Sequence, residues 1–433
     1  MVALPNRIDG SAYGYDNIVG TSGGDLIFTY NGGNVIEGGA GADIIFGSST
    51  AYATDTASYE HSTSALQVDL RVALQHGGDA EGDQLYGIQD VIGSAFNDRI
   101  TGDELDNHLD GGAGLDTLIG GAGNDNLFGG FDGKADILDG GTGIDTVDYS
   151  TAASGMTIAL DTTTTFVATF GTYQVFADGS ARLNGASGSV LEDVLRNMEN
   201  VIGTAFNDTI TGNERNNVIK GGAGADTINC KGGIDTIDYS TSGWSTGPGV
   251  QIDLTQTLQH GGDAEGDKLA SIENIIGSYA KDVLNGDGGG NVIEGGSGDD
   301  IINGRGGNDT IYSGQGADIL DGGAGADVFQ YKDTRDSGAG YRNSYRGQYR
   351  VEYGNDTILN FETGIDKIDL RLIDAIYGNA TSDRFVFADS LTGVAGQLVL
   401  SGGTLMGDVT GDGIADLVIN AVGAQKSDIL GVL

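Results

Sequence analysis

Aspartates recur at every ninth position in glycine-rich stretches of this 433-residue chain. Residues 295–329, GGSGDDIINGRGGNDTIYSGQGADILDGGAGADVF, place Asp300, Asp309, Asp318 and Asp327 nine residues apart. Neighbouring carboxylates repel each other strongly unless a cation lies between them. Carboxylate oxygens, together with the carbonyl oxygens of glycine-rich turns, form a flexible, all-oxygen ligand set that suits Ca²⁺ better than Zn²⁺ or Mg²⁺. The pattern therefore predicts repeated calcium sites.

The same nine-residue unit occurs twenty times, in runs over residues 11–46, 93–148, 203–238 and 277–330, with one unit stretched to eleven residues. Every unit has Ile, Leu, Val or Phe two residues after its sixth position. The sixth position is Asp in sixteen units, which are the predicted calcium ligands: Asp16, Asp25, Asp43, Asp98, Asp116, Asp125, Asp136, Asp145, Asp208, Asp226, Asp235, Asp282, Asp300, Asp309, Asp318 and Asp327. The glycines predicted to complete these sites are Gly39, Gly41, Gly112, Gly114, Gly121, Gly123, Gly222, Gly224, Gly296, Gly298, Gly323 and Gly325. The other four units have Asn34, Asn107, Asn217 and Asn291 there, and calcium binding at these units stays open.

The unit also predicts the fold. Its last three residues read as a short strand with one side chain turned inward, and its first six reverse the chain, with glycine tolerating the positive φ angles of such turns. Two strands and two turns make a coil of eighteen residues, and coils stacked about 4.8 Å apart make a two-layer parallel solenoid. The fold class is therefore all-β, and stacking pairs residues eighteen apart: Asp300 with Asp318, Asp309 with Asp327, Asp208 with Asp226, Asp98 with Asp116, and Asp25 with Asp43.

With these residues the chain resembles the RTX (repeats-in-toxin) proteins, whose nonapeptide GGxGxDxUx forms a calcium-binding parallel β-roll. The resemblance covers most of residues 11–330 and implies several bound Ca²⁺ ions. Residues 331–433, with DTILNFETGIDKIDLRLIDA, RFVFADSLTGVAGQLVLSG and GDVTGDGIADLVINAVG, resemble the C-terminal region of serralysin-type metalloproteases. That second resemblance implies that this region closes the roll and carries a type I secretion signal, with the protein secreted, extracellular or at the cell surface. Blocks are expected at 1–92, 93–202, 203–330 and 331–433.

Three longer, related segments interrupt the repeats, at 55–92, 145–202 and 235–276. The first and third share LQHGGDAEGD, in which His76, Asp79, Glu81 and Asp83, or His260, Asp263, Glu265 and Asp267, could form a metal or catalytic cluster. The alternative is a turn of the same roll with an extra calcium, and it is favoured because no second histidine or base lies at ligand spacing. Asp79, Asp83, Asp263 and Asp267 are then predicted ligands. In the middle segment, a hairpin packed on the roll is favoured over a partner contact for Phe166, Phe170, Tyr173 and Phe176.

Composition narrows the function. The chain has 62 acidic and 21 basic residues, a formal net charge of −41, which excludes nucleic acid and anionic membrane surfaces as partners. Its N-terminus lacks a basic and an apolar signal region, and no run of about 20 apolar residues occurs, so neither Sec export nor a membrane span is expected. Cys230 is interpreted as a small residue in a tight turn. Asp408, Thr410, Asp412 and Gly413 resemble the start of an EF-hand loop, but Ile419 at position twelve favours a hairpin turn.

The sequence predicts no enzyme. His61, His76, His108 and His260 never form HExxH, no GxSxG or phosphate loop occurs, and the repeats begin within about ten residues of Met1, which leaves no room for a catalytic domain. The expectation is a roll without an attached enzyme.

The stretch YRNSYRGQYRVEY combines aromatic and basic residues: Tyr341, Arg342, Tyr345, Arg346, Tyr349, Arg350 and Tyr353. We expect a helix with one aromatic and one basic stripe, or an ordered loop; a solvated loop is the alternative. Tyr and Arg are enriched at interface hot spots, so the stretch is a candidate contact for self-assembly or for an acidic cell-surface polysaccharide or lipopolysaccharide. Three functions stay open: a secreted structural protein that assembles at the cell surface, a polysaccharide-binding or adhesion module similar to the repeat modules of alginate epimerases, and an enzyme with an unrecognised site.

Overall fold

The computed structural model describes residues 6–11, 15–48, 54–162, 165–168, 171–174, 178–185, 188–243, 247–344, 347–377 and 383–433. Within these ranges, the side chains of 161–179, 183–192 and 338–353 are outside the description. The chain forms two compact units, Met1–Asn217 and Val218–Leu433, which are considered one at a time. The described residues contain strands and four short 3-10 helices, η1 (Gly78–Ala80), η2 (Gly262–Ala264), η3 (Thr334–Asp336) and η4 (Lys426–Asp428), and no α-helix, which confirms the all-β prediction.

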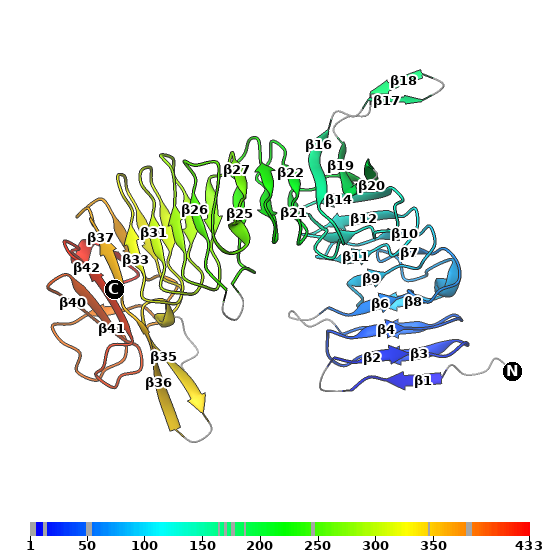
Figure 1. The fold of residues 1–433 in the computed structure, drawn as a ribbon. Helices are drawn as coiled ribbons and strands as arrows, with labels where there is room; N and C mark the ends of the chain where they lie inside the picture. The colour runs from blue at the N-terminus through cyan, green and yellow to red at the C-terminus, as the bar shows by residue number, and fades with distance from the viewer. Residues whose placement is uncertain are drawn as a thin grey trace. The chain divides into compact units, whose positions relative to one another are not determined.

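The first unit has strands on two sides of a flattened coil (Figure 1). One side is a parallel series of β2 (Asn17–Val19), β4 (Val35–Glu37), β6 (Thr56–Ser58), β9 (Asp90–Ile92), β11 (His108–Asp110), β13 (Asn126–Phe128), β15 (Thr146–Asp148) and β21 (Asn200–Ile202). The other side begins with β1 (Asn6–Asp9), β3 (Asp25–Phe28), β5 (Ile44–Phe46) and β8 (Gln84–Tyr86). A second sheet on that side contains β7 (Gln67–Asp69), β10 (Arg99–Thr101), β12 (Thr117–Ala122), β14 (Asp136–Thr142), β20 (Gly188–Arg196), β19 (Asp178–Gly185), β16 (Met156–Thr162) and β22 (Thr209–Thr211).

The middle insertion departs from the parallel pattern. Its strands β16, β19 and β20 pair antiparallel, and β17 (Thr165–Ala168) forms an antiparallel hairpin with β18 (Gly171–Gln174) in which Phe166 lies opposite Tyr173. The predicted hairpin is therefore present. Among the described strands, β17 and β18 pair only with each other, so no backbone pairing joins this hairpin to the roll. Phe170 and Phe176 lie outside the described residues.

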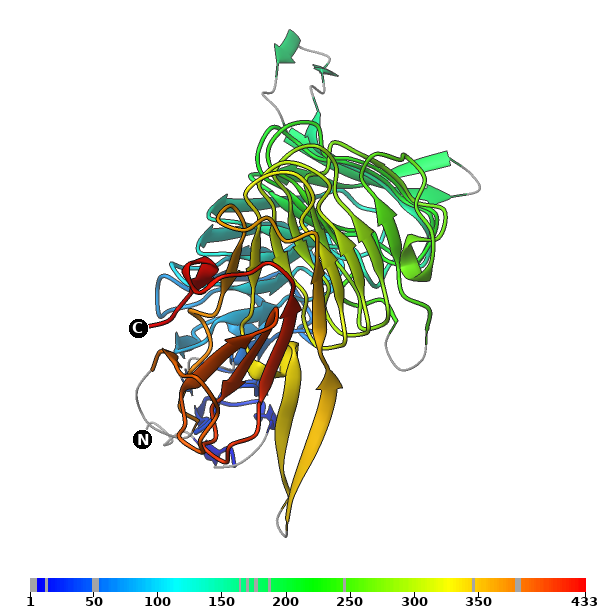
Figure 2. The same cartoon turned by 90° about the vertical axis from the view of Figure 1, so that its left-hand side faces the viewer.

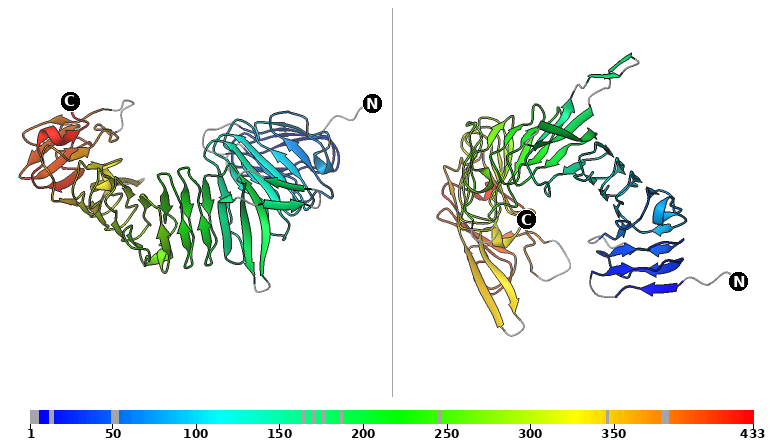
Figure 3. Two further views of the ribbon diagram at one scale, coloured as in Figure 1. Left: turned by 90° about the horizontal axis from the view of Figure 1, so that it is seen from above. Right: turned by 45° about the vertical axis from the view of Figure 1, so that its right-hand side comes forward.

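The second unit repeats the two-sided arrangement (Figure 3). One side contains β23 (Val218–Lys220), β25 (Thr236–Asp238), β28 (Asn274–Ile276), β30 (Val292–Glu294), β32 (Thr310–Tyr312), β34 (Val328–Gln330), β38 (Lys367–Asp369) and β43 (Ile429–Leu430). The other contains the pair β24 (Thr227–Asn229) and β27 (Lys268–Ala270), and then β26 (Gln251–Asp253), β29 (Val283–Asn285), β31 (Ile301–Asn303), β33 (Ile319–Asp321), β37 (Asp356–Leu359), β42 (Leu417–Ala421), β41 (Thr404–Asp408), β40 (Gln397–Ser401) and β39 (Val386–Phe387). Residues after 331 thus continue both sides of the roll.

The strand register confirms the coil of eighteen residues. Ile302 pairs with Leu284 on one side and with Leu320 on the other, each eighteen residues away. On the opposite side Ile311 pairs with Ile293 in the same way. These inward residues are at most 1% exposed, because each coil covers the apolar side chains of its neighbour. The predicted stripe of eighth-position residues is the core.

The Tyr and Arg stretch is neither a helix nor a loop. β35 (Gly338–Ser344) and β36 (Gly347–Gly354) form an antiparallel hairpin in which Tyr341 lies opposite Arg350 and Arg342 opposite Tyr349. Neighbouring residues on a strand belong to opposite faces, so the stripes expected for a helix do not form. Figure 2 shows this hairpin extending from the strands of the second unit. Tyr345 and Arg346 lie outside the described residues.

Candidate calcium sites

Carboxylates of stacked coils are linked by a ladder of hydrogen bonds. The backbone amide of Asp300 donates to Oδ1 of Asp318 at 2.8 Å, and the amide of Asp282 donates to Oδ1 of Asp300 at 2.8 Å. In the first unit the amide of Asp98 donates to Oδ1 of Asp116 at 2.7 Å. The predicted pairs Asp309 with Asp327 and Asp25 with Asp43 are joined in the same way. The structure therefore brings together the pairs that lie within one unit.

The second oxygen of eight of these carboxylates is buried and has no hydrogen-bond partner. Each of the eight side chains belongs to a residue at most 1% exposed: Asp43, Asp116, Asp125, Asp145, Asp300, Asp309, Asp318 and Asp327. An ionised oxygen without a donor or cation carries a large desolvation penalty. A bound cation removes that penalty, so these eight residues fit the Ca²⁺ ligand role that the sequence predicts for them.

Glycines make room for these oxygens. A Cβ on Gly304 would lie 2.2 Å from Oδ2 of Asp309, and a Cβ on Gly111 would lie 2.8 Å from Oδ2 of Asp116. Of the twelve predicted glycines, eleven have φ between +85° and +144°. Gly114 is the exception, and its Cβ would lie 2.4 Å from Oδ1 of Asp116. Side chains at these positions would fill the space beside the carboxylates or strain the turn.

Burial changes the protonation of the ladder. It raises the pKa of Asp300 to about 8 and that of Asp309 to about 7, and the charges of Asp318 and Asp327 respectively add to the effect. Burial raises the pKa of Asp116 to about 7 in the first unit, where Asp136 adds to the effect. Without a cation these carboxyls hold protons near neutral pH, and a bound cation displaces them.

The first aspartate of each run differs from the eight above because a protein amide donates to its Oδ2. In three runs a second amide also donates to its Oδ1. Oδ1 of Asp98 accepts the amide of Leu66 at 2.7 Å and its Oδ2 accepts the amide of Ser94 at 2.6 Å. Asp208 and Asp282 repeat this arrangement, with donors from Thr204 and Ser278 and from the preceding coil. Asp16, the first aspartate of the remaining run, accepts the amide of Ser11 at Oδ2, and Asp25, the second aspartate of that run, accepts the amide of Thr21 at Oδ2.

The twin LQHGGDAEGD segments fold alike and join the ladder. Oδ1 of Asp83 accepts the amide of Asp43 at 2.8 Å, and its Oδ2 accepts the hydroxyl of buried Tyr59 at 3.0 Å. Asp267 accepts the amide of Asp226 and the hydroxyl of Tyr239, both at 2.8 Å. These two aspartates therefore take the place of a sixth-position residue, with a tyrosine hydroxyl as the donor to Oδ2, and their role as calcium ligands stays a prediction.

The remaining polar residues of the twin segments lie farther from the ladder. Asp79 is close enough that its charge raises the pKa of Asp43 and of Asp83, in each case after the larger effect of burial. Asp263, its counterpart, likewise adds to the raised pKa of Tyr239, which is caused first by burial. His76 and His260 are exposed and face Glu81 and Glu265 at 3.7 and 3.5 Å. In the described part of the chain neither histidine belongs to a group of three metal-binding side chains.

Several acids that take part in the ladder lie outside the nonapeptides. Glu199 accepts the amide of Asp145 at 3.0 Å and Glu273 accepts that of Asp235 at 2.8 Å. Asp356 and Asp366 accept the amides of Asp318 and Asp327 in the same way. The two glutamates were detectable, because IQDVIG, MENVIG and IENIIG place Gln or Glu at one position.

A carboxylate pair also formed unexpectedly. The carboxyls of Asp136 and Asp193 converge beside Gly129, whose Cβ would lie 2.7 and 2.8 Å from one oxygen of each. Burial, with Asp193 as the largest neighbouring charge, raises the pKa of Asp136 to about 8. Asp193 lies far from the nonapeptide pattern, and only folding shows that it belongs with Asp136.

The structure also places the Asp408 turn, Cys230 and a small group of acids with His61. The residues after Asp408 form the hairpin turn between β41 and β42, and both oxygens of Asp408 accept amides, from Gly411 and Gly413. Cys230 is buried, and burial raises the pKa of its thiol, which agrees with a packed small residue. Glu37, Glu60 and His61 gather from separate segments, and no sequence pattern indicated this group.

Comparison with known proteins agrees with the repeat assignment. The family model of the RTX calcium-binding nonapeptide repeat matches residues 16–50, 101–133, 202–237, 276–311 and 294–329. Serralysin of Proteus mirabilis is 40% identical over 208 residues, which are 46% of this chain and 38% of that protein. The chain thus spans well under half the length of this curated relative.

Two solved structures also match. The AlgE6R3 subunit of the mannuronan C5-epimerase of Azotobacter vinelandii is 27% identical, with a TM-score of 0.23 over 35% of this chain and 78% of that one. The extracellular lipase LipA of Serratia marcescens is 14% identical, with a TM-score of 0.25 over 92% of this chain and 45% of that one. Separately, no described helix has the length and apolar character needed to cross a bilayer.

Proposed function

We propose that this chain, whose nonapeptide repeats match the RTX calcium-binding family model and bind several Ca²⁺ ions, is a secreted structural protein that folds on extracellular calcium. We further propose that the folded chain self-assembles at the cell surface, as a surface-layer or extracellular matrix component. The type I secretion route that we propose rests on the resemblance of residues 331–433 to the C-terminal region of serralysin-type metalloproteases.

The observation that carries calcium-dependent folding is the row of buried carboxylate oxygens without donors. Asp300, Asp309, Asp318 and Asp327 contribute four of them within one run of the second unit. A formal net charge of −41 opposes compaction of the same chain. Calcium binds only where the coils are stacked, so it stabilises the folded chain by mass action. A calcium-poor cytosol then keeps the chain unfolded for export.

Self-assembly is supported by the β35–β36 hairpin. Its backbone register places Tyr opposite Arg at two successive pairs, on a chain that is otherwise strongly acidic. Tyr and Arg are residue types enriched at interfaces, and the positive charge of Arg favours contact with an acidic surface, including that of a second copy of this chain.

Electron microscopy of the purified chain before and after transfer from chelator into millimolar calcium tests both parts, with circular dichroism as the measure of folding. We expect β-structure and ordered sheets, tubes or filaments with calcium. Replacing Tyr341, Arg342, Tyr349 and Arg350 by Ser should abolish assembly and leave the calcium-dependent dichroism unchanged. Folded, dispersed wild-type chains would rule out the assembly proposal.

A second candidate function is binding of an acidic polysaccharide. A cavity of about 460 Å³ in the second unit is lined in part by Lys332, Arg335, Asp374 and Tyr377, and the Tyr377 side chain is 67% exposed. Asp333 also lines this cavity and pairs with Arg335 at 2.8 Å, so the support for this function is the exposed Tyr377 with two basic residues in the same cavity. Calcium-dependent retention of the chain on alginate or lipopolysaccharide, lost in the Tyr377→Ala variant and without array formation, would favour this function over assembly.

An enzymatic function is the weakest candidate. We propose that the exposed His76 and His260 are turn residues, so His76→Ala and His260→Ala should leave any activity found in the purified chain unchanged.

A further inference from the structure

Three asparagines at the sixth position satisfy their own polar atoms. Oδ1 of Asn107 accepts the amide of Asp103 at 2.8 Å, and its Nδ2 donates to the carbonyl oxygen of Gln89 at 2.8 Å. Asn291 makes the same bonds, from the amide of Asp287 at 2.9 Å and to the carbonyl of Glu273 at 2.7 Å.

Asn217 repeats the arrangement. Its Oδ1 accepts the amide of Asn213 at 2.9 Å, and its Nδ2 donates to the carbonyl of Glu199 at 2.8 Å. In all three units the accepting carbonyl lies eighteen residues earlier, one coil away. The side-chain amide therefore supplies a fixed donor where the calcium units leave a carboxylate oxygen without a partner.

The second position of the unit distinguishes these turns as well. The three asparagine units have Asp103, Asn213 or Asp287 there, and each side chain also accepts from the Nδ2 group of its asparagine, at 3.1 to 3.4 Å. The unit just before each of them has Ser94, Thr204 or Ser278 at the second position. The hydroxyl and the backbone amide of this residue both donate to the carboxylate of the aspartate four residues later. Most of the units whose aspartates have unpartnered oxygens have glycine at that position.

In the three runs that begin at residues 93, 203 and 277, these two unit types occur together at the beginning of the run, in the order Ser or Thr unit and then Asn unit. In the run over residues 11–46 the Thr21 unit and the Asn34 unit come second and third, and Tyr30 is at the second position of the Asn34 unit. We name residues 94–107, 204–217 and 278–291 the start coils. Their backbone amides donate to the first carboxylates of the ladder that follows. The amides of Asp98 and Asn107 donate to Asp116 and Asp125. In the second unit the amides of Asp282 and Asn291 donate to Asp300 and Asp309.

We propose that the start coils keep their turn conformation without calcium and present the amides that orient the first calcium-binding carboxylates of a run. In these three runs the residues at positions two and six decide which type a unit is. Asp with a residue of positive φ at position two, which is Gly or in single units Arg305 or Lys231, gives a calcium turn. Ser or Thr with Asp, and Asp or Asn with Asn, give a turn closed by protein hydrogen bonds. This inference rests on the proposed calcium-driven folding.

Hydrogen exchange of the full chain, followed by mass spectrometry in chelator and in millimolar calcium, tests the inference directly. In chelator, peptides covering 94–107 and 278–291 should exchange several-fold more slowly than peptides covering 300–327. Equal, rapid exchange of both groups in chelator would overturn the start-coil proposal. Slow exchange of 300–327 in chelator would instead overturn calcium-driven folding, so the two failures are distinguishable.

Asn291→Asp provides a second test, with Asp309→Asn as its matched control. Asn291→Asp replaces the donor by an oxygen that faces the carbonyl of Glu273, so the calcium midpoint for folding should rise roughly fivefold or more. Asp309→Asn should lower the number of Ca²⁺ ions bound, measured by equilibrium dialysis. An Asn291→Asp chain that binds one more ion at an unchanged midpoint would overturn the proposal. If Asn291→Asp does not fold, Ser278→Ala supplies the same comparison, with a smaller expected rise in the midpoint; an unchanged midpoint would overturn it.

Discussion

One hydrogen bond joins Asp300 to Asp318, and one carboxylate oxygen of Asp318 has no hydrogen-bond partner. The amide of Asp300 donates to Oδ1 of Asp318 at 2.8 Å, whereas Oδ2 of Asp318 is buried without a donor. One carboxylate thus links two coils and also presents an oxygen for a cation. Burial, followed by the charge of Asp356, raises the pKa of Asp318 to about 9.

Removing this carboxylate should weaken both calcium binding and coil stacking. In Asp318→Ala the amide of Asp300 loses its acceptor and the site loses a ligand. We expect the free energy of unfolding in the presence of calcium to fall by about 2 kcal/mol. Thermal unfolding in millimolar calcium and a calcium titration followed by circular dichroism measure the two effects. Asp389→Ala, at an exposed acid, is the control and should match the wild type. Identical calcium midpoints for the two variants would contradict the ligand assignment.

The calcium-free chain should gain structure on acidification. The pKa of Asp43, Asp116 and Asp309 is raised from 3.8 to about 7 in the folded state, mainly by burial. Between about pH 4 and pH 7 the folded chain binds protons that the unfolded chain has released, so its stability falls as pH rises through this window. The stability of the calcium-free chain is greatest below the pKa of the unfolded state and lowest above about pH 7.

Circular dichroism in chelator at pH 4.5 and pH 7.5 checks this dependence, with a parallel series in calcium. Because protons and Ca²⁺ compete for the same oxygens, the calcium midpoint should fall as the pH rises from 5 to 8. Calcium-free structure that is stronger at pH 7.5 than at pH 4.5 would show that other groups control the transition.

Glycine at the second position should be required where the chain approaches the previous coil. Gly323 has φ +93°, and a Cβ there would lie 2.1 Å from the carbonyl oxygen of Arg305. Gly323→Ala should therefore destabilise the calcium-bound chain by about 1–3 kcal/mol. Gly288, in the same run, does not have a positive φ, and a Cβ there would meet no atom within 4 Å. Gly288→Ala should leave the melting temperature nearly unchanged, and equal losses in both variants would count against the close approach as the cause.

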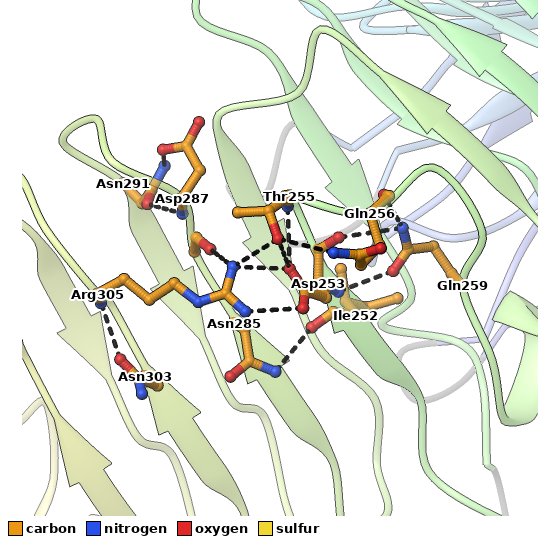
Figure 4. Close-up of polar contacts among 11 residues, drawn as sticks. Ile252, Asp253, Thr255, Gln256, Gln259, Asn285, Asp287, Asn291, Asn303 and Arg305 are labelled. Atoms are coloured by element: carbon orange, nitrogen blue, oxygen red, sulfur yellow. Dashed lines mark hydrogen bonds and ion pairs between the residues drawn. The ribbon is translucent and has the colours of Figure 1, made fainter.

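Arg305 supplies a permanent positive charge within the calcium run. Its guanidinium makes two hydrogen bonds of 2.7 Å to Asp253 and one of 2.9 Å to the carbonyl of Gly286 (Figure 4). The Arg305 hydrogen bond is the largest cause that lowers the pKa of Asp253 to about 2. The pair is about one-third exposed, so solvent screens it.

A double-mutant cycle with Arg305→Ala and Asp253→Ala measures this pair. We expect a coupling energy of about 1 kcal/mol, reduced by added salt, because the contact is bidentate and only partly buried. Chemical unfolding in saturating calcium is the measurement, so that ion binding does not differ between variants. Additive effects of the two substitutions would mean that the pair does not stabilise the roll.

Sequence reasoning succeeded where the signal is periodic and local. The spacing of Ile293 and Ile311 predicted the core, and the spacing of Asp300 and Asp318 predicted the ladder, because a coil of eighteen residues repeats both. It failed for Tyr341 and Arg342, where a spacing of four suggested a helix but the chain forms a hairpin. Pairing between the two strands of that hairpin overrides helical spacing there.

By itself, the sequence determined the solenoid, its coil length, its inward stripe and the kind of ion that it binds, since each follows from a repeat of nine residues. Only the tertiary structure decided which carboxylate oxygens have protein hydrogen-bond donors and which have none. Asp98 and Asp116 occupy the same position of the unit, yet protein donors reach both oxygens of Asp98, whereas Oδ2 of Asp116 has none. The difference depends on donors from Ser94 and from the preceding coil at Leu66, and such contacts between distant residues exist only once the coils are stacked.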